Sequence, residues 1–248
     1  MLATDRAAQA GAVVFLLDVD NTLLDNDRFA ADLGARLEHG FGPAGRDRYW
    51  ALFAGLRDTL GYADYLGALQ AFRSGLDDDP GLLQMSDYLL EYPFAQRLYP
   101  GALDAISRLG RLGLTVILSD GDMVFQPRKI QRSGIWAAVS GRVLIQVHKQ
   151  DALDATQRRY PAGHYVMVDD KPQLLAAMKQ VLGARLTTIF VRQGHYAAAA
   201  AGAAIDPAPD FRIEHIGELI DFDPAHFRAG APRHAAPPFP KPFLQEQT

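Results

Sequence analysis

Two aspartates, Asp18 and Asp20, follow an apolar run that has the character of a buried strand, and one residue separates them. Side chains two positions apart on an extended segment point the same way, so both carboxylates can face one cavity beyond the strand's end. One can then attack phosphorus while the other transfers protons, as in an aspartyl-phosphate enzyme. The same pattern also occurs in turns, where aspartates accept hydrogen bonds from nearby backbone amides. The pair alone favours the turn.

Later polar residues change this balance, because they too stand at or soon after apolar, strand-like runs. They are Ser119, Lys149 and the pair Asp169 and Asp170. Ligands of α/β sheets bind beyond the carboxyl ends of the strands, so these side chains are expected to gather with Asp18. Four functional elements in this order are difficult to obtain by chance and favour a functional site.

The order and character of these residues resemble the haloacid dehalogenase (HAD) superfamily. Its four motifs are a nucleophile Asp-x-Asp-x-Thr, a strand-ending Ser or Thr, a Lys and a terminal acidic pair. The resemblance spans about residues 12 to 192. It implies that Asp18 is the nucleophile that forms an aspartyl phosphate, and that Asp20 protonates the leaving alkoxide and then activates water. Asn21 replaces the Gly that many members carry there, although Asn also tolerates unusual backbone angles.

Phosphate binding is expected from residues near the first two motifs. The resemblance implies that the hydroxyl of Ser119 and nearby backbone amides hold phosphoryl oxygens, helped by Gly121. Thr22 occupies the family's helper position, and the alternative is a hydroxyl that braces the loop.

Lys149 is the candidate for neutralising the phosphate and the crowded carboxylates, because its charge sits on a flexible stem. Its rivals are Lys171, beside the acidic pair, and a role as a solvated helix start. Lys149 precedes Asp169 by 20 residues with a helical segment between them, which resembles the family's spacing.

A magnesium site is expected from oxygen ligands alone. Asp169 and Asp170 complete a cluster with Asp18, and the backbone carbonyl of Asp20 would also face the metal. Carboxylates, waters and substrate phosphate are the ligands that Mg²⁺ prefers. By family resemblance Asp170 is the direct ligand, and Asp169 binds the metal through water or supports the direct ligands. The pair could instead cap the following helix, and one of them could do both.

The fold class predicted from the apolar runs is α/β, a doubly wound parallel sheet with helices on both faces and a Rossmann-like, HAD-like core. The runs are nearly continuous rather than alternating, which is typical of buried parallel strands. Helical patterns separate them, as at residues 103–112 and 174–182, so right-handed crossovers are expected. The predicted strands are 12–17, 114–118, 143–147, 165–168 and 186–191, with 211–213 as a candidate sixth.

Residues 25–98 form an inserted all-helical segment in this interpretation. Several stripes of apolar residues at helical spacing occupy it, and no comparable strand-like run does. Its position resembles the helical cap of C1-type HAD enzymes, which would exclude water and gate turnover; the simpler interpretation is a helical bundle with its own core. Residues 1–24 and 99–221 make the α/β core. The Pro-rich tail, 222–248, is expected to lack regular structure, either frayed or as an arm anchored by aromatic residues.

Composition limits the class of protein. The chain has 248 residues, of which 48% are hydrophobic, so a soluble globular protein with a substantial core is expected. The formal charge is −4 without a long basic run, which argues against nucleic acid as the main partner. There is no Cys, so disulfides and thiol catalysis are excluded. The apolar run near the N-terminus, residues 12–17, is too short for a signal peptide's core or a membrane span, so no membrane partner and a cytoplasmic location are expected.

Three histidines and two arginines are predicted to have ordinary roles. His148, His164 and His195 lack the i, i+4 spacing of a helical metal site, so surface or supporting roles are expected. Arg28 and Arg192 could bind a second anionic group of a substrate, but ordinary surface positions are favoured.

The predicted activity is a magnesium-dependent phosphatase that acts on a small phosphate monoester. Dehalogenation is disfavoured because haloacid dehalogenases lack the second aspartate, which Asp20 retains here. Phosphonatase chemistry usually needs a cap lysine, and the first Lys of this chain is Lys129. A phosphomutase or a non-catalytic protein that binds a phosphorylated ligand remains an alternative. Neither the substrate nor the oligomeric state, with a homodimer among the options, follows from the sequence.

Overall fold

The chain folds around a six-stranded, all-parallel sheet in the order β3-β2-β1-β4-β5-β6. This computed structural model describes residues 12–76, 78–149, 152–200 and 202–227. The predicted α/β fold class is confirmed, and the candidate sixth strand is present. The strands are β1 (Val13–Leu17), β2 (Leu114–Asp120), β3 (Val143–Gln146), β4 (His164–Asp169), β5 (Leu186–Val191) and β6 (Phe211–Ile213).

The register of the central strands explains where the functional residues meet. Leu17, the last residue of β1, pairs with Ile117 of β2 and with Val168 of β4. The residues that follow these two positions and Leu17 therefore lie next to one another at the same edge of the sheet. Strand β2 runs two residues further than predicted, to Asp120, so Ser119 lies within the strand rather than after it.

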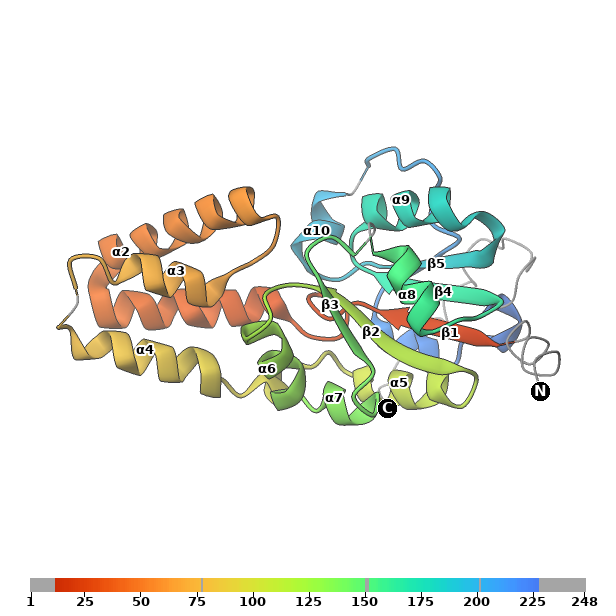
Figure 1. Cartoon of the computed structure of the whole chain (residues 1–248), viewed down its shortest axis with the longest axis horizontal. Coiled ribbons are helices and arrows are strands. Elements are labelled where there is room, and N and C mark those ends of the chain that lie inside the picture. Colours follow the sequence, from red (N-terminus) through yellow and green to blue (C-terminus); the bar gives the residue numbers. More distant parts are fainter. Residues whose placement is uncertain (1–11, 77, 150–151, 201, 228–248) are drawn as a thin grey trace, which may run out of the picture.

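Helices cover both faces of the sheet because successive strand residues point to opposite sides. Phe15 and Leu17 of β1 belong to a core shared with α5, α6 and α7. Val14 and Leu16 belong to a core shared with α8, α9 and α10. Figure 1 shows these two layers on either side of the sheet. The helices are α5 (Ala102–Gly110), α6 (Phe125–Arg132), α7 (Ile135–Ala138), α8 (Leu153–Arg159), α9 (Pro172–Leu182) and α10 (Gly194–Ala199).

A helical insertion, defined as residues 26–97, separates β1 from β2 and extends to one side of the sheet (Figure 1). Non-helical torsion angles at Gly42, followed by Pro43, kink its longest helix. Its core is continuous with the core under one face of the sheet. The elements are α2 (Asn26–Leu60), α3 (Tyr65–Phe72), α4 (Pro80–Glu91) and a 3-10 turn, η1 (Phe94–Arg97).

The two connections between the insertion and the sheet run beside each other. The amide of Asp25 donates to the carbonyl of Arg97 at 2.7 Å, and the amide of Tyr99 donates to the carbonyl of Leu23 at 3.0 Å. These two hydrogen bonds join the crossing that enters the insertion to the crossing that leaves it.

The end of the described chain is more regular than expected. A short 3-10 turn, η4, spans Pro224–Phe227. Two other 3-10 turns precede it in the chain, η2 (Gly183–Arg185) and η3 (Ile216–Ile220). Phe227 is buried and meets Phe15 edge-on, with ring centroids 5.0 Å apart. The expectation of no regular structure was therefore wrong for residues 224–227, where an aromatic ring anchors the chain. The rest of the predicted tail, 228–248, lies outside the described residues.

None of the helices that the structure describes is both long and apolar enough to cross a membrane.

Candidate active site

Lys149 bridges two carboxylates at the carboxyl edge of the sheet. Its Nζ lies 2.6 Å from Oδ1 of Asp18 and 2.6 Å from Oδ2 of Asp169, and its side chain is fully buried. Burial alone disfavours the ammonium, but the charges of Asp169, Asp18 and Asp120 outweigh it and raise the pKa of Lys149 above its ordinary value. Lys149 is therefore a fixed positive charge against the predicted nucleophile rather than a solvated helix start.

Lys171, the rival candidate, takes a different position. Its backbone amide donates to Oδ1 of Asp169 at 2.9 Å, while its Nζ lies over the ring of Tyr196, 4.8 Å from the centroid. The charge of Lys171 is close to the carboxylates, but the direct ion pair with Asp18 belongs to Lys149.

Three buried carboxylates form a cluster beside this lysine. Asp18, Asp169 and Asp170 each offer an oxygen, and these oxygens all lie within 4.8 Å of one another. The three side chains belong to residues that are at most 3% exposed. Oδ2 of Asp18 and both oxygens of Asp170 have no hydrogen-bond partner among the described residues.

The electrostatics of this cluster favour a bound cation. Burial, followed by the charges of Asp169 and Asp18, raises the pKa of Asp170 to about 9. Burial also raises the pKa of Asp169, although Lys149 opposes the shift. Several buried carboxylate oxygens without a hydrogen-bond partner among the described residues are a donor set that fits a hard divalent ion. The residues present thus fit the metal that the sequence predicts.

Asp20 lies in a second group of side chains. Its Oδ1 accepts from Nζ of Lys129 at 2.7 Å, and its Oδ2 accepts from Nε2 of Gln126 at 3.1 Å. The same amide donates to Oγ of Ser119 at 3.0 Å. Asp20 is 28% exposed, in contrast to Asp18, so the two carboxylates have different surroundings. The Asp20 carboxylate is not part of the three-carboxylate cluster formed by the described residues.

The remaining predicted phosphate-binding residues lie close in the chain to these groups. Thr22 is fully buried, and its Oγ1 has no hydrogen-bond partner within the described part of the chain. The amide of Gly121 donates to the carbonyl of Gln146 at 3.0 Å, so this donor is occupied by the sheet. A Cβ at Gly121, where φ is 156°, would lie 2.8 Å from the side chain of Gln126. We therefore expect Gly121 to contribute space for Gln126.

Asn21 supports the first motif through its backbone and its side chain. Its φ of 60° is left-handed, the unusual angle that the sequence anticipated. Its Oδ1 accepts from the amides of Asn26 and Asp27 at 3.0 and 3.2 Å. Asn21 thus binds two amides in the first turn of α2, next to the N-cap residue Asp25, while its backbone turns the loop that carries Asp20.

Sequence reasoning missed three polar residues of the site. Oδ1 of Asp120 accepts from the amide of Lys149 at 2.8 Å and fixes its loop, and burial raises the pKa of Asp120. Gln126 and Lys129 hold Asp20 from α6. Their spacing of three on a helix that begins just after the Ser119 motif was an available signal, because residues i and i+3 share a helix face.

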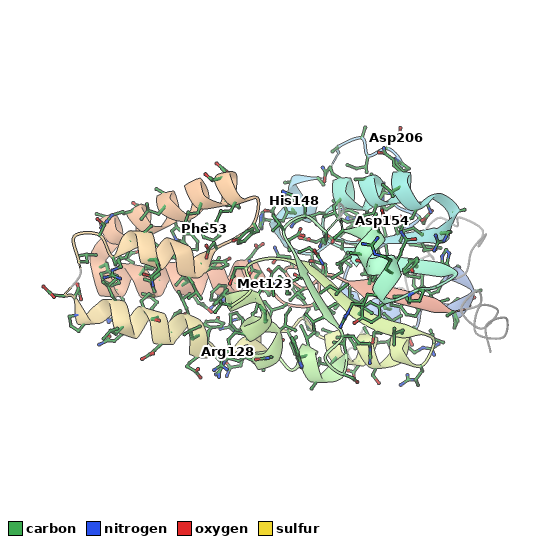
Figure 2. All side chains as sticks on the ribbon, in the orientation of Figure 1. Phe53, Met123, Arg128, His148, Asp154 and Asp206 are labelled. Carbon is green, nitrogen blue, oxygen red and sulfur yellow. The ribbon has the colours of Figure 1, made fainter. Side chains whose placement is uncertain are left out.

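The histidines occupy supporting positions. His164 is buried at the start of β4, where its Nε2 lies 2.9 Å from Oγ1 of Thr187. His195 pairs with Asp27 at the start of the insertion. His148 lies between the insertion and the sheet (Figure 2), where it packs against Gly61 of the insertion.

The two arginines are in surface ion pairs. Arg28 pairs with Asp32 at 3.2 Å, and Arg192 pairs with Glu214 at 2.8 Å. More than half of each arginine side chain is exposed. Both positions agree with ordinary surface arginines.

Comparisons with known proteins agree with this architecture. A protein from Burkholderia xenovorans LB400, provisionally described as a haloacid dehalogenase-like hydrolase, is 57% identical, with a TM-score of 0.80; the match covers 86% of this chain and 99% of that one. An L-2-haloacid dehalogenase from Xanthobacter autotrophicus matches with a TM-score of 0.53 and 18% identity over 84% of this chain and 96% of its own. No curated protein matches the sequence.

A third solved structure is similar in fold and contains magnesium. It is YfnB from Bacillus subtilis, provisionally described as a HAD hydrolase, with a TM-score of 0.56 and 18% identity over 85% of this chain and 98% of that one. The family model for haloacid dehalogenase-like hydrolases matches residues 13–181. This stretch contains the four motifs and the inserted helices, and the chain therefore belongs to the haloacid dehalogenase-like hydrolases.

Proposed function

We propose that this hydrolase is a magnesium-dependent phosphatase that cleaves a small phosphate monoester through an aspartyl-phosphate intermediate. The observation that carries the proposal is the cluster of Asp18, Asp169 and Asp170 beside the buried ammonium of Lys149. A phosphoryl group brings up to two negative charges to the nucleophile, so its transfer needs a concentration of positive charge at that point.

The chain's own residues account for the two chemical steps. In the first, an oxygen of Asp18 attacks phosphorus, the bond to the ester oxygen breaks, and Asp20 supplies the proton that the departing alkoxide takes. In the second, Asp20 takes a proton from water as that water attacks phosphorus. Inorganic phosphate leaves, and the Asp18 carboxylate is regenerated.

The positive charges have separate tasks in this scheme. Lys149 stays charged and holds Asp18 in place while it offsets charge on the phosphoryl oxygens. Asp18, Asp169 and Asp170 would hold Mg²⁺. Both oxygens of Asp170 lack a hydrogen-bond partner in the part of the chain that the structure describes, which supports direct ligation by this residue. The bound ion would supply further charge neutralisation to the phosphoryl group.

Asp20 favours phosphatase over dehalogenase chemistry. The dehalogenases among the similar structures act on a carbon–halogen bond, and a halide leaves without a proton. A retained Asp20 whose two oxygens are oriented by Lys129 and Gln126 is useful to an ester, whose alkoxide must be protonated. At 18% identity, the likeness to the Xanthobacter dehalogenase shows the fold alone.

Phosphate release from a panel of sugar phosphates, nucleoside monophosphates and phosphorylated small acids tests the proposal. Wild type, Asp18→Asn and the exposed control Asp154→Asn are assayed with Mg²⁺ and with chelator. We expect magnesium-dependent release from wild type and the control, and none from Asp18→Asn, because an amide is not a nucleophile here.

Parallel assays of halide release and of phosphate transfer between sugar hydroxyls cover the other reactions of this fold. Metal-independent halide release from 2-haloacids, or phosphate transfer without hydrolysis, would contradict the phosphatase proposal. So would normal turnover by Asp18→Asn.

A further inference from the structure

Lys129 is a fully buried lysine that the four motifs do not include. It lies on α6, and its Nζ donates to Oδ1 of Asp20 at 2.7 Å and to Oδ1 of Asn26 at 2.9 Å. Removing an ammonium from water costs several kcal/mol, which its partners must offset. The groups that contact Lys129 should therefore explain why a buried ammonium is retained at this position.

Four aromatic rings surround the same ammonium. Their centroids lie 5.5 to 5.9 Å from Nζ, within the range of cation–π attraction. Phe29 and Tyr65 come from helices of the insertion, Phe94 from the turn that ends it, and Phe125 from α6 itself. Lys129 therefore joins the nucleophile loop to the inserted helices at one point.

The result for Asp20 is a carboxylate held at both oxygens. Lys129 binds Oδ1, while Gln126 binds Oδ2 and also reaches Ser119. Turning the Asp20 carboxylate away from this position would break at least one of these contacts. Lys149 makes the matching ion pair with Asp18, so each of the two aspartates has its own lysine.

We propose that Lys129 is a positioning residue for the acid–base aspartate: it orients Asp20, and the docked insertion in turn keeps Lys129 in place. The contact with Asn26, the first residue of α2, makes this orientation depend on the insertion. The proposal rests on the proposed phosphatase function, because it assigns Lys129 to the step in which Asp20 transfers a proton.

A purely stabilising ion pair would behave differently. Replacing one member by an apolar residue of similar length would then change stability without any preference for substrate. Met is close to Lys in length and suits the ring-lined pocket, and the exposed fraction of Asp20 allows water to solvate it. Lys129→Met is thus expected to fold and to leave Asp20 free to rotate.

Leaving-group dependence is the measurement that separates the two roles. Values of kcat/KM are determined for an alkyl monophosphate, whose alkoxide must be protonated, and for p-nitrophenyl phosphate, whose leaving group needs little help. For Lys129→Met we expect a loss of roughly 100-fold with the alkyl ester and less than about 10-fold with the aryl ester, as general acid catalysis predicts. Asn26→Ala should give the same preference with a smaller loss.

Lys179→Met is the matched control, because Lys179 makes a comparable ion pair with Asp210 at 2.7 Å away from Asp20. It should affect both substrates equally. Equal losses in Lys129→Met, no loss at all, or a leaving-group preference in Lys179→Met would overturn the positioning role, although the phosphatase proposal would stand.

A wild type that hydrolyses neither these esters nor any member of the phosphate panel would instead contradict the phosphatase function. The crystal structure of Lys129→Met then decides the positioning claim without an activity assay. An Asp20 carboxylate that turns away from Gln126 supports it, and one that keeps the wild-type orientation overturns it.

Discussion

Asp170 offers a test of the cation site that needs no substrate. Its carboxyl group is buried, and neither oxygen has a hydrogen-bond partner among the described residues. Burial and the neighbouring carboxylates raise its pKa to about 9, compared with about 3.9 in an unfolded chain. Between these values the metal-free folded protein keeps a proton that the unfolded chain releases.

The sign and size of the stability change follow from this difference. Because the folded state binds more protons in this window, the free energy of unfolding falls as the pH rises from about 4 towards about 9. Each pH unit corresponds to about 1.4 kcal/mol, so the loss between pH 5 and pH 8 is about 4 kcal/mol. Asp170→Asn removes the titrating group, so it should become more stable than metal-free wild type by an amount that grows over this range.

Urea denaturation at pH 5, 6.5 and 8 in the presence of chelator measures this difference. Asp154→Asn, an exposed change on α8, is the control and should not alter the pH profile. Added Mg²⁺ should stabilise wild type, most strongly at pH 8, and should stabilise Asp170→Asn much less. An Asp170→Asn variant that is no more stable than wild type at pH 8, or a difference that does not change with pH, would refute the reasoning.

Three other substitutions probe separate contacts. Lys149→Ala leaves two buried carboxylates without their cation, so urea denaturation should show a loss of about 3–5 kcal/mol in the free energy of unfolding, and phosphate release should be lost. A larger loss of phosphate release in Lys171→Ala would assign the phosphate-neutralising role to Lys171. Gly61→Ala places a Cβ against His148 at a left-handed backbone angle, and thermal denaturation should report a loss of about 1–2 kcal/mol; unchanged stability would show that the loop adapts. Phe227→Ala empties a core position and should cost about 3–5 kcal/mol in urea, whereas a loss under 1 kcal/mol would mean that the ring is not an anchor.

The sheet and the order of its functional residues follow from local sequence. Strands buried on both faces must be nearly continuous apolar runs, so the runs in this chain mark β1 to β6 to within a few residues. The parallel connections then bring the ends of β1, β2 and β4 to one edge. This pattern brings Asp18, Asp169 and Lys149 to the same region. It does not predict the 2.6 Å ion pairs between them.

The partners of Asp20 depend on tertiary structure alone. Lys129 is 109 residues away in the chain, and its pocket is assembled from both ends and the middle of the insertion and from α6. Periodicity identifies helices and their apolar faces, but the angle at which they pack decides which polar group reaches which carboxylate. The position of Phe227 also depends on tertiary structure. The Pro-rich sequence around it predicts irregular structure, and only the folded protein shows that its ring packs against Phe15. The sequence by itself thus determined the sheet, the four motifs and the chemistry they can do, whereas the docking of the insertion decided how Asp20 is held for that chemistry.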